Sequence, residues 1–307
     1  MIASTVSVIS RIHIGELPYV NAFIAHYKRI GVDSIYLIIT KANELEQIKN
    51  YLQSAGSFVK YISVELKAGE SISMDNMSYI LQDISEDYIL HIDIDEFLEV
   101  SCSIKEVITS EDADKIHFPW AITVNDGVSD ISKACYGMTH RNKPYKTLCR
   151  RAKIVRFISN GHDFETLDGV KEVISSHLLI HYWGRTFEDI MLKALYANGF
   201  NNAKNSTISE VMTAVADNNV NLLPNRLKMF AVLSRLEKTI HLERDYSLKF
   251  IDKAKETELL SALVTNDQRD KLYTKYTHFR SALDYETQVR PYYNLGLLGF
   301  NWAEMKV

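Results

Sequence analysis

The chain has 307 residues, of which 46% are hydrophobic and 24% are charged, and its formal net charge is −4 at pH 7. These are the proportions of an ordinary globular protein with room for one large domain or two modest ones, and the acidic balance argues against a nucleic-acid-binding protein that relies on bulk electrostatic attraction. No apolar stretch approaches the length of a membrane span, and three cysteines without a Cys-x-x-Cys pair favour a reducing, cytoplasmic environment.

Predicted strands and helices alternate through the first third of the chain. The N-terminus lacks the basic start and long apolar centre of a signal peptide, and residues 5–11 instead predict a strand. Residues 16–30 have the apolar spacing of a helix, which Gly31 ends. The later elements are a strand at 34–40, a helix at 44–54, a strand at 59–66, a helix at 75–84 and a strand at 88–95. This alternation predicts a parallel α/β sheet that binds ligands at the carboxyl ends of its strands.

The strand predicted at residues 88–95 ends in an acidic cluster. Alternate side chains of a strand share a face, so His91, Asp93 and Asp95 are expected to point to one side. Buried carboxylates at Asp93, Asp95 and Glu96 would repel one another unless a cation lay among them. A hard divalent metal, Mg²⁺ or Mn²⁺, is the natural counterion for oxygen ligands. The cluster therefore indicates a metal site that serves phosphate chemistry.

Three other interpretations of this cluster compete with a metal site. The aspartates can open a helix, because acidic residues favour a first helical turn. An EF-hand calcium loop is disfavoured, because Phe97 and Leu98 stand where an oxygen ligand and a glycine are needed. A phosphatase-type aspartyl nucleophile stays open, although such a motif ordinarily follows the first strand of its fold.

After residue 114 the pattern changes to a mixed β region and then to helices. Strands are predicted at 115–123, 147–157 and 176–182, and helices at 186–197, 209–216, 225–239, 247–264 and 267–277. A boundary near residue 200 divides the chain into domains 1–200 and 201–307. The helical region is expected to pack on the first domain, to form homo-oligomers or to position an acceptor. Its apolar end, residues 292–302, is interpreted as docked core, with contact to a partner or a membrane surface as the alternative.

Several segments together carry a family resemblance. Residues 15–27 and the Gly31-Val32-Asp33 that follows them are similar to the opening of bacterial family-2-like and family-92-like enzymes. Residues 92–97 resemble the Asp-x-Asp-Glu-Phe signature of the same enzymes. Residues 146–150, with Gly161-His162 further on, are similar to their Lys-x-x-x-Arg and Gly-His elements. With the order of its parts, the chain thus resembles the GT-A glycosyltransferases, which use nucleotide-sugar donors, over roughly its first 195 residues.

The resemblance implies a GT-A fold, in which helices flank a mixed sheet, followed here by a C-terminal helical region. It implies an enzyme, expected to invert configuration, that moves a sugar from a nucleotide-diphosphate donor to an acceptor hydroxyl. UDP-sugar is the favoured donor, a saccharide or glycolipid the acceptor, and Mn²⁺ or Mg²⁺ the cofactor. The implied setting is surface-polysaccharide synthesis in the cytoplasm, at the inner face of the membrane, with no role for nucleic acid.

The resemblance also suggests how a metal would be held. Asp95 would bind it most directly, and Asp93 would reach the metal or the donor ribose. His181 begins a His-aromatic-x-Gly element similar to the one that completes the metal site in several GT-A enzymes, and it is favoured as third ligand over a core histidine. Arg185 or Lys193 would then meet the diphosphate, unless Lys193 is only a solvated helix residue.

Further side chains are candidates for substrate contacts. Arg11 and Thr40 follow the first two predicted strands and are expected to bind the nucleotide, whereas Lys146 and Arg150 belong to the substrate-binding element. His162 competes with His181 as metal ligand and could equally contact sugar or acceptor. Asp163 is the favoured general base of an inverting reaction, with Glu165 and Asp126 as alternatives.

Two other functions use the same residues differently. A nucleotidyl- or phosphotransferase would share the metal site, but it would be expected to carry a Gly-rich phosphate loop after the first strand, where only Gly15 stands. An inactive GT-A-like scaffold would bind through its helical region. Because such a scaffold has no need of a costly acidic cluster, the presence of Asp93, Asp95 and His181 argues against it.

Overall fold

The computed structural model describes residues 4–64, 73–124, 135–139, 145–196, 208–219, 222–235, 240–242 and 251–289. Contacts divide the chain into two compact units, each assembled from segments that are distant in sequence. Unit 1 consists of Met1–Ile14, Tyr19–Ala121 and His140–His181, and unit 2 of Gly15–Pro18, Ile122–Thr139 and Tyr182–Val307. The domain boundary near residue 200 lies outside the described residues, so the division into 1–200 and 201–307 stays a prediction.

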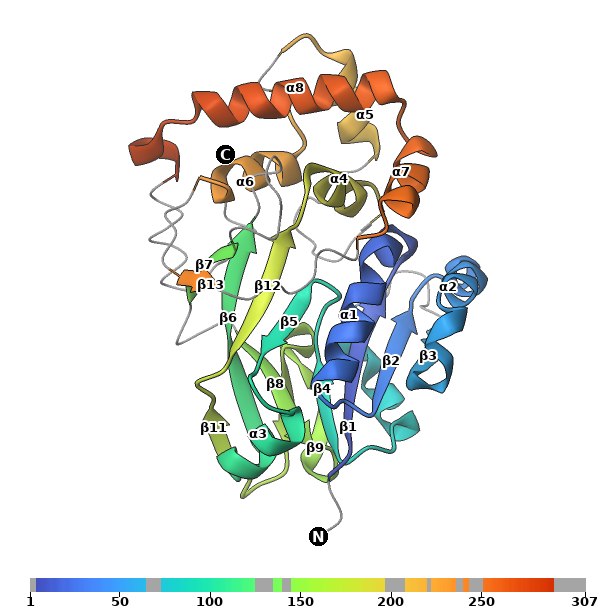
Figure 1. The fold of residues 1–307 in the computed structure, drawn as a ribbon, viewed down its shortest axis with the longest axis vertical. Helices are drawn as coiled ribbons and strands as arrows, with labels where there is room; N and C mark the ends of the chain where they lie inside the picture. Colours follow the sequence, from blue (N-terminus) through green and yellow to red (C-terminus); the bar gives the residue numbers. More distant parts are fainter. Residues whose placement is uncertain are drawn as a thin grey trace. The chain divides into compact units, whose positions relative to one another are not determined.

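Unit 1 is built on a mixed sheet with the strand order β6-β8-β4-β1-β2-β3 (Figure 1). The strands are β1 (Val6–Ile12), β2 (Ser34–Ile39), β3 (Val59–Ser63), β4 (Tyr88–His91), β6 (Lys115–Val124) and β8 (Tyr145–Arg150). β1 pairs in parallel with β2 and β4, and β2 with β3, whereas β8 is antiparallel to β4 and β6. Every residue of β1 and β2 is buried, as central parallel strands require. The predicted fold class, a mixed sheet with flanking helices and further helices towards the C-terminus, is confirmed.

Helices follow most of the parallel strands. They are α1 (Leu17–Arg29), α2 (Leu45–Tyr51) and α3 (Ile104–Glu111), and the segment predicted as a helix at 75–84 is the 3-10 helix η4 (Met74–Asp83). Shorter 3-10 turns are η1 (Ile14–Glu16), η2 (Ala42–Glu44), η3 (Gln53–Phe58), η5 (Arg151–Lys153) and η6 (Ser159–Gly161). α3 starts with a capping box, in which the Ser103 side chain accepts from the Glu106 backbone and the Glu106 side chain accepts from the Ser103 backbone.

Two sequence predictions fail where strands end. The strand predicted at 88–95 stops at His91, and the chain turns before β5 (Glu96–Glu99), which pairs antiparallel with β12 (Leu178–Gly184). The strand predicted at 147–157 is interrupted by η5, so that β9 (Ile154–Ile158) pairs with β10 (Asp163–Thr166) instead of joining the main sheet. A short strand, β11 (Glu172–Ile174), runs parallel to β6.

The last turns of α1 hold β5 in place. The Tyr27 hydroxyl donates to the Glu96 carbonyl at 3.0 Å and accepts from the Leu98 amide at 3.1 Å. The His26 Nε2 lies 3.1 Å from the Leu98 carbonyl, and its Nδ1 lies 3.2 Å from the Arg29 guanidinium. These bonds fix the backbone at Glu96, which directly follows Asp95 in the chain.

A variant of His26 should change how stability depends on pH. Burial, followed by the nearby Arg29, lowers the pKa of His26 to about 3, against 6.5 in an ordinary environment. Between these values the unfolded chain binds a proton at His26 that the folded chain does not, so the free energy of unfolding falls as pH falls from 6.5 towards 3. We expect His26→Gln to remove about 1 kcal/mol per pH unit from this slope in urea denaturations between pH 4 and 7. His278→Gln, at an exposed position of α8 (Asn266–Ala282), is the control, and an equal effect there would contradict the prediction.

Unit 2 contains mostly helices in its described part. They are α4 (Phe187–Tyr196), α5 (Ile208–Ala216), α6 (Asn225–Leu233), α7 (Lys253–Ser261), α8 and the π-helix η8 (Tyr285–Val289). Tyr276 of α8 joins three of them, because its ring stacks on Phe230 of α6 at 5.5 Å and contacts Phe187 of α4 at 5.4 Å. The expectation of helix throughout this region is wrong at β13 (Ile240–Leu242), which pairs with β7 (Cys135–Thr139). The apolar segment 292–302 lies outside the described residues.

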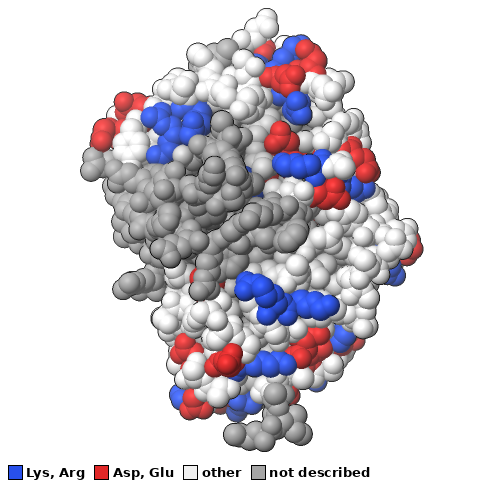
Figure 2. Space-filling view, in the orientation of Figure 1, with Lys and Arg blue, Asp and Glu red and all other residues white. Residues whose placement is uncertain are grey.

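The described part of the chain has no membrane-spanning helix, and neither sign of charge dominates the face drawn in Figure 2. Among the described residues, no helix is both long enough and apolar enough to cross a membrane. On the face drawn in Figure 2, basic and acidic side chains occur in small interspersed groups. This distribution agrees with the modest net charge of the chain.

Candidate active site

The carboxyl ends of the parallel strands bring several candidate residues to one edge of the sheet in unit 1. Arg11 lies near the end of β1, Thr40 follows β2, and Asp93 follows β4. Because β1 is parallel to both neighbours, these three positions share an edge. The edge predicted from the alternation of strands and helices is therefore the one at which the acidic residues gather.

The acidic residues lie on a tight turn rather than on a strand. The Glu96 amide donates to the Asp93 carbonyl at 3.0 Å, and the Asp93 amide donates to the Glu96 carboxylate at 2.7 Å. Glu96 is fully buried, whereas the Asp93 side chain is 31% exposed. The expected shared strand face of His91, Asp93 and Asp95 is thus wrong, because these reciprocal bonds turn the chain after Ile92.

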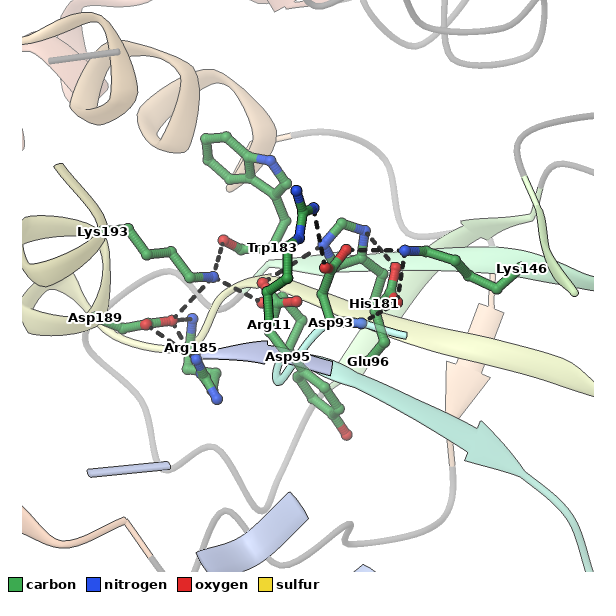
Figure 3. A network of polar contacts seen from close by, with 11 residues as sticks. Arg11, Asp93, Asp95, Glu96, Lys146, His181, Trp183, Arg185, Asp189 and Lys193 are labelled. Carbon is green, nitrogen blue, oxygen red and sulfur yellow. Dashed lines mark hydrogen bonds and ion pairs between the residues drawn. The ribbon is translucent and has the colours of Figure 1, made fainter. Parts of the chain in front are cut away.

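Two cations neutralise the first aspartate. The Lys146 ammonium lies 2.9 Å from Asp93 Oδ2 and 3.4 Å from Glu96 Oε2, and the Arg11 guanidinium lies 3.6 Å from Asp93 Oδ1 (Figure 3). Burial would raise the pKa of Asp93, but Lys146 and then Arg11 outweigh it and hold that pKa well below its usual range. At Glu96 burial prevails over the attraction of Lys146 and raises the pKa to about 7. Asp93 therefore carries a full negative charge that two basic side chains already compensate.

Asp95, the second aspartate, lies next to His181. The His181 Nε2 lies 3.5 Å from Asp95 Oδ2, and its Nδ1 lies 3.9 Å from Glu96 Oε1 (Figure 3). The pairing of β5 with β12 explains the approach, because His181 stands directly opposite Glu96 in the register. Both side chains are about one-tenth exposed, so a ligand bound between them would be largely shielded from water.

The separation of Asp95 and His181 would allow both side chains to bind one divalent cation. Neighbouring ligands of an octahedral ion with bonds of about 2.1 Å lie about 3 Å apart. The distance between Asp95 Oδ2 and His181 Nε2, 3.5 Å, is close to this value. Within the described residues, no group of three His, Cys, Asp or Glu side chains is arranged to hold a metal ion. Asp93 does not complete a three-ligand group with Asp95 and His181, because its carboxylate is turned towards Lys146 and Arg11. Its role as a metal ligand stays a prediction.

Trp120 of β6 contacts both candidate histidines, a role that its place in the sequence does not predict. Its ring lies 4.8 Å from the His181 ring and 5.0 Å from the His162 ring, and the Lys146 ammonium is 5.9 Å from its centroid. Burial, followed by the charge of Lys146, lowers the pKa of His162 to about 3, so that this imidazole is neutral at pH 7. The only signal in the sequence was an aromatic residue within a predicted strand, which core packing explains equally well.

A left-handed turn holds His162 beside these residues. Three consecutive residues have positive φ: Ser159 at 55°, Asn160 at 57° and Gly161 at 79°. The Asn160 side-chain oxygen accepts from Arg11 at 3.3 Å and from the Met74 amide at 3.2 Å, and the Gly161 carbonyl lies 2.8 Å from His91 Nδ1. Such a conformation is costly for residues other than glycine, and it persists only where surrounding contacts enforce it.

Gly161→Ala should destabilise the fold strongly. A Cβ at this position would lie 2.7 Å from His91 Nδ1 and 2.9 Å from Met74 Cβ, in addition to the strain of a φ of +79°. We expect a loss of about 2–5 kcal/mol in the free energy of unfolding, measured by urea denaturation. Gly169→Ala is the matched control, because its φ is +74° but no atom lies within 4 Å of the added Cβ. Equal losses in the two variants would show that the contacts with His91 and Met74 contribute nothing.

The predicted base, Asp163, is engaged in contacts of its own. Its Oδ1 lies 3.0 Å from the Lys115 ammonium and accepts from the Thr147 hydroxyl at 3.1 Å and the Phe164 amide at 2.8 Å. These contacts orient the carboxylate, and its role as base stays a prediction. Of the alternatives, Glu165 forms an ion pair with Arg156 at 2.5 Å, and Asp126 lies outside the described residues.

The structure does not bring Arg150 to the acidic turn. Lys146 and Arg150 both lie on β8, four residues and thus about 13 Å apart. Arg150 stands opposite Tyr88, at the amino end of β4, where it pairs with Asp114 at 2.7 Å and its guanidinium lies 4.9 Å from the Tyr88 ring. Its contacts are those of a structural residue, and a role in substrate binding would require a ligand that spans the length of the strand.

The two predicted phosphate partners, Arg185 and Lys193, share one carboxylate within unit 2. Arg185 makes a bidentate contact with Asp189 at 3.0 and 3.2 Å, and the Lys193 ammonium lies 3.5 Å from the same residue (Figure 3). Lys193 also donates to the Trp183 carbonyl at 2.9 Å. Asp189 thus holds both cations in place. Their contact with a diphosphate stays a prediction.

Comparisons with known proteins identify no family. No family model and no curated protein matches the chain. Among solved structures, S. aureus TarS 1-349 in complex with UDP-GlcNAc is 11% identical, with 95% of this chain and 87% of that chain covered and a TM-score of 0.40. HddC from Yersinia pseudotuberculosis is 14% identical (61% and 96% covered, TM-score 0.37), and GalNAc-T7 with UDP, GalNAc and Mn²⁺ is 15% identical (59% and 43% covered, TM-score 0.37). Likenesses this weak assign no activity, so the function has to be inferred from the residues of the site.

Proposed function

We propose that this chain is a metal-dependent GT-A glycosyltransferase, which moves a sugar from a nucleoside-diphosphate donor to an acceptor hydroxyl. One observation carries the proposal: the turn after β4 presents Asp95 3.5 Å from His181 and, on the same turn, Asp93 against Lys146 and Arg11. UDP-sugar is the favoured donor, and a saccharide or glycolipid is the acceptor. The Asp-x-Asp-Glu-Phe signature at this turn supports both choices by resemblance.

The chemistry requires positive charge where a diphosphate departs. As the bond between sugar and phosphate breaks, negative charge develops on the leaving oxygens, and preorganised cations stabilise it. Lys146 is fully buried and Arg11 is 7% exposed, so both charges act in a site with little water to screen them. Asp93 orients both groups and is itself available to accept hydrogen bonds from the donor.

Asp95 and His181 would hold the Mn²⁺ or Mg²⁺ ion. When bound, such an ion supplies Lewis-acid stabilisation of the diphosphate. Asp163 is the proposed base for an inverting reaction. Its Oδ1 is occupied by Lys115, Thr147 and the Phe164 amide, which leaves Oδ2 to accept the proton of the acceptor hydroxyl.

The wider setting follows from the resemblance alone. We place the enzyme in surface-polysaccharide synthesis at the inner face of the membrane, with the helical region 201–307 docking, forming homo-oligomers or positioning the acceptor. Arg185 and Lys193, which Asp189 holds in place, are the further candidates for the diphosphate.

Thermal unfolding with nucleotides tests the proposal. The protein is heated with UDP, GDP, CMP or dTDP, each with and without Mn²⁺. One nucleoside diphosphate should raise the Tm by about 5 °C at a concentration near 100 times Kd, only when Mn²⁺ is present. Stabilisation that ignores the metal, or none by any nucleotide, would refute the proposal. A nucleotidyltransferase would instead release pyrophosphate from a nucleoside triphosphate and a sugar phosphate, which a pyrophosphate assay detects.

A further inference from the structure

Trp120 and His162 form a pair of rings for whose nitrogens the described residues provide no hydrogen-bond partner. The two ring centroids lie 5.0 Å apart at an interplanar angle of 67°. Trp120 is 5% exposed, and its Nε1 is buried without a hydrogen-bond partner among the described residues. Within the same part of the chain, no hydrogen bond or ion pair of the His162 ring is found. A buried donor without a partner is rare in folded proteins and calls for an explanation.

The pair is held rigidly on both sides. Trp120 lies on β6, in the main sheet, and His162 follows the left-handed turn. The His162 carbonyl accepts from the Thr147 hydroxyl at 3.3 Å, and the preceding Gly161 carbonyl lies 2.8 Å from His91 Nδ1. Backbone contacts thus fix the position of His162, while its ring nitrogens form no hydrogen bond within the described residues, which is the arrangement of a preorganised binding residue.

The pair lies close to the charged residues of the candidate site. Trp120 contacts both histidines, with its ring 4.8 Å from that of His181 and 5.0 Å from that of His162, and the Lys146 ammonium lies 5.9 Å from its centroid. His162 and the proposed metal ligand His181 therefore contact the same indole ring. A molecule with its diphosphate at Lys146 and Asp95 could reach the pair with the group attached to that diphosphate.

The chemistry of the pair selects a polyhydroxylated ring. An indole offers a flat apolar face that packs against C–H groups, together with one N–H donor at its edge. A neutral imidazole offers one donor and one acceptor, and sugar hydroxyls can satisfy both because each hydroxyl donates and accepts. A phosphate accepts hydrogen bonds and favours positive charge, which Lys146 and Arg11 supply instead.

We propose that Trp120 and His162 bind a saccharide ring, with the Trp120 Nε1–H donating to one of its oxygens and the His162 ring bonding a hydroxyl. This inference rests on the proposed glycosyltransferase function and assigns part of its substrate site. The sugar of the donor and the sugar of the acceptor share this chemistry. Binding measurements with separate ligands distinguish the two sources.

Trp120→Phe and His162→Gln test the assignment. The first variant keeps an aromatic face but loses the N–H, and the second keeps a neutral polar group but loses the ring. Calorimetric titrations with Mn²⁺ use UDP, then UDP-glucose, UDP-galactose and UDP-GlcNAc, then the free sugars glucose, galactose and GlcNAc. If the nucleotide screen selects another base, its diphosphate and sugar derivatives replace those of UDP. Tyr88→Phe is the control, because it also removes a hydroxyl or N–H group from a buried aromatic residue, at the far end of β4.

The expected result is a loss of about tenfold in affinity for a sugar-bearing ligand, with the Kd of UDP changed less than twofold. A loss confined to the UDP-sugars assigns the pair to the donor sugar, and a loss confined to the free sugars assigns it to the acceptor. The sugar-bearing ligand should also change the tryptophan emission of the wild type but not that of Trp120→Phe.

Other outcomes overturn the inference. If the wild type binds UDP but gains no affinity from any sugar and binds no free sugar, the pair is not a saccharide site, although the proposed function survives. The inference also fails if both variants bind every sugar-bearing ligand as the wild type does. If the wild type binds no nucleotide at all, the proposed function fails first, and the inference falls with it. Thermal melting of each variant shows that a lost affinity is not a lost fold.

Discussion

Asp95→Ala should abolish the metal-dependent stabilisation by a nucleoside diphosphate and lower the transfer rate by about 100- to 1,000-fold. Its carboxylate lies 3.5 Å from His181, whereas the carboxylate of Asp93 lies against Lys146 and Arg11. If Asp95 binds the metal as proposed, its removal leaves the departing diphosphate without one of its main stabilising charges, an effect of the size seen when a preorganised electrostatic group is lost. The measurement is the Tm shift with nucleotide in the presence and absence of Mn²⁺, followed by single-turnover rates.

Asp168→Ala is the matched control for this prediction. Asp168 is an exposed acid in the loop after β10, and it should keep both the Tm shift and the rate of the wild type. His181→Ala should reproduce the effect of Asp95→Ala, because both residues would contact the same ion. If Asp95→Ala retains the metal-dependent shift, the metal is bound elsewhere, and the proposed site is wrong.

Lys146→Met should lower the free energy of unfolding by about 3–5 kcal/mol. The ammonium is fully buried and lies 2.9 Å from Asp93 and 3.4 Å from Glu96. Methionine fills a similar volume but leaves Asp93 with Arg11 alone and Glu96 without the Lys146 ammonium, and removing one partner of a buried ion pair is far more costly than removing one partner of an exposed pair. Urea denaturation at pH 7 measures the loss, and an unchanged m-value shows that the unfolded state is the same.

An exposed pair provides the comparison. Lys171 is 56% exposed and its partner Asp112 is 88% exposed, so Lys171→Met should cost less than about 1 kcal/mol. Adding Glu96→Gln to Lys146→Met should recover part of the loss, because the amide cannot ionise at the buried position that Lys146 no longer neutralises. If Lys146→Met costs no more than Lys171→Met, the ammonium does not stabilise the acidic turn.

The fold class was predictable because its signals are local and repeated. The strands β1 and β2 are continuous apolar runs, and Gly31 after α1 has the φ of +86° that a helix end favours. The parallel pairing of β1 with β2 and β4 then brings Arg11 and Asp93 to one edge, whatever the details of each loop. Chain order alone was enough to locate the candidate site.

The features of the site that could not be predicted from the sequence depend on contacts between distant segments. Residues 92–95 have the composition of a strand, and only the bonds between Asp93 and Glu96 show that the chain turns there. Lys146 and Arg150 looked equivalent as members of one motif, yet the antiparallel register of β8 with β4 sends them to opposite ends. The position of Trp120 in the candidate site could not be predicted without knowing the neighbours of β6, because a tryptophan in a strand is ordinarily a core residue.

The left-handed turn at residues 159–161 has a consequence for the order in which the protein folds. Asn160 bonds Arg11, 149 residues earlier, and Gly161 contacts His91, 70 residues earlier. A turn that is unfavourable on its own cannot persist until β1 and β4 are already paired, and contacts with such long sequence separation form slowly. We therefore expect the parallel strands to assemble first and the placement of His162 to follow. During synthesis, more than half of the chain must leave the ribosome before this part of the site can exist.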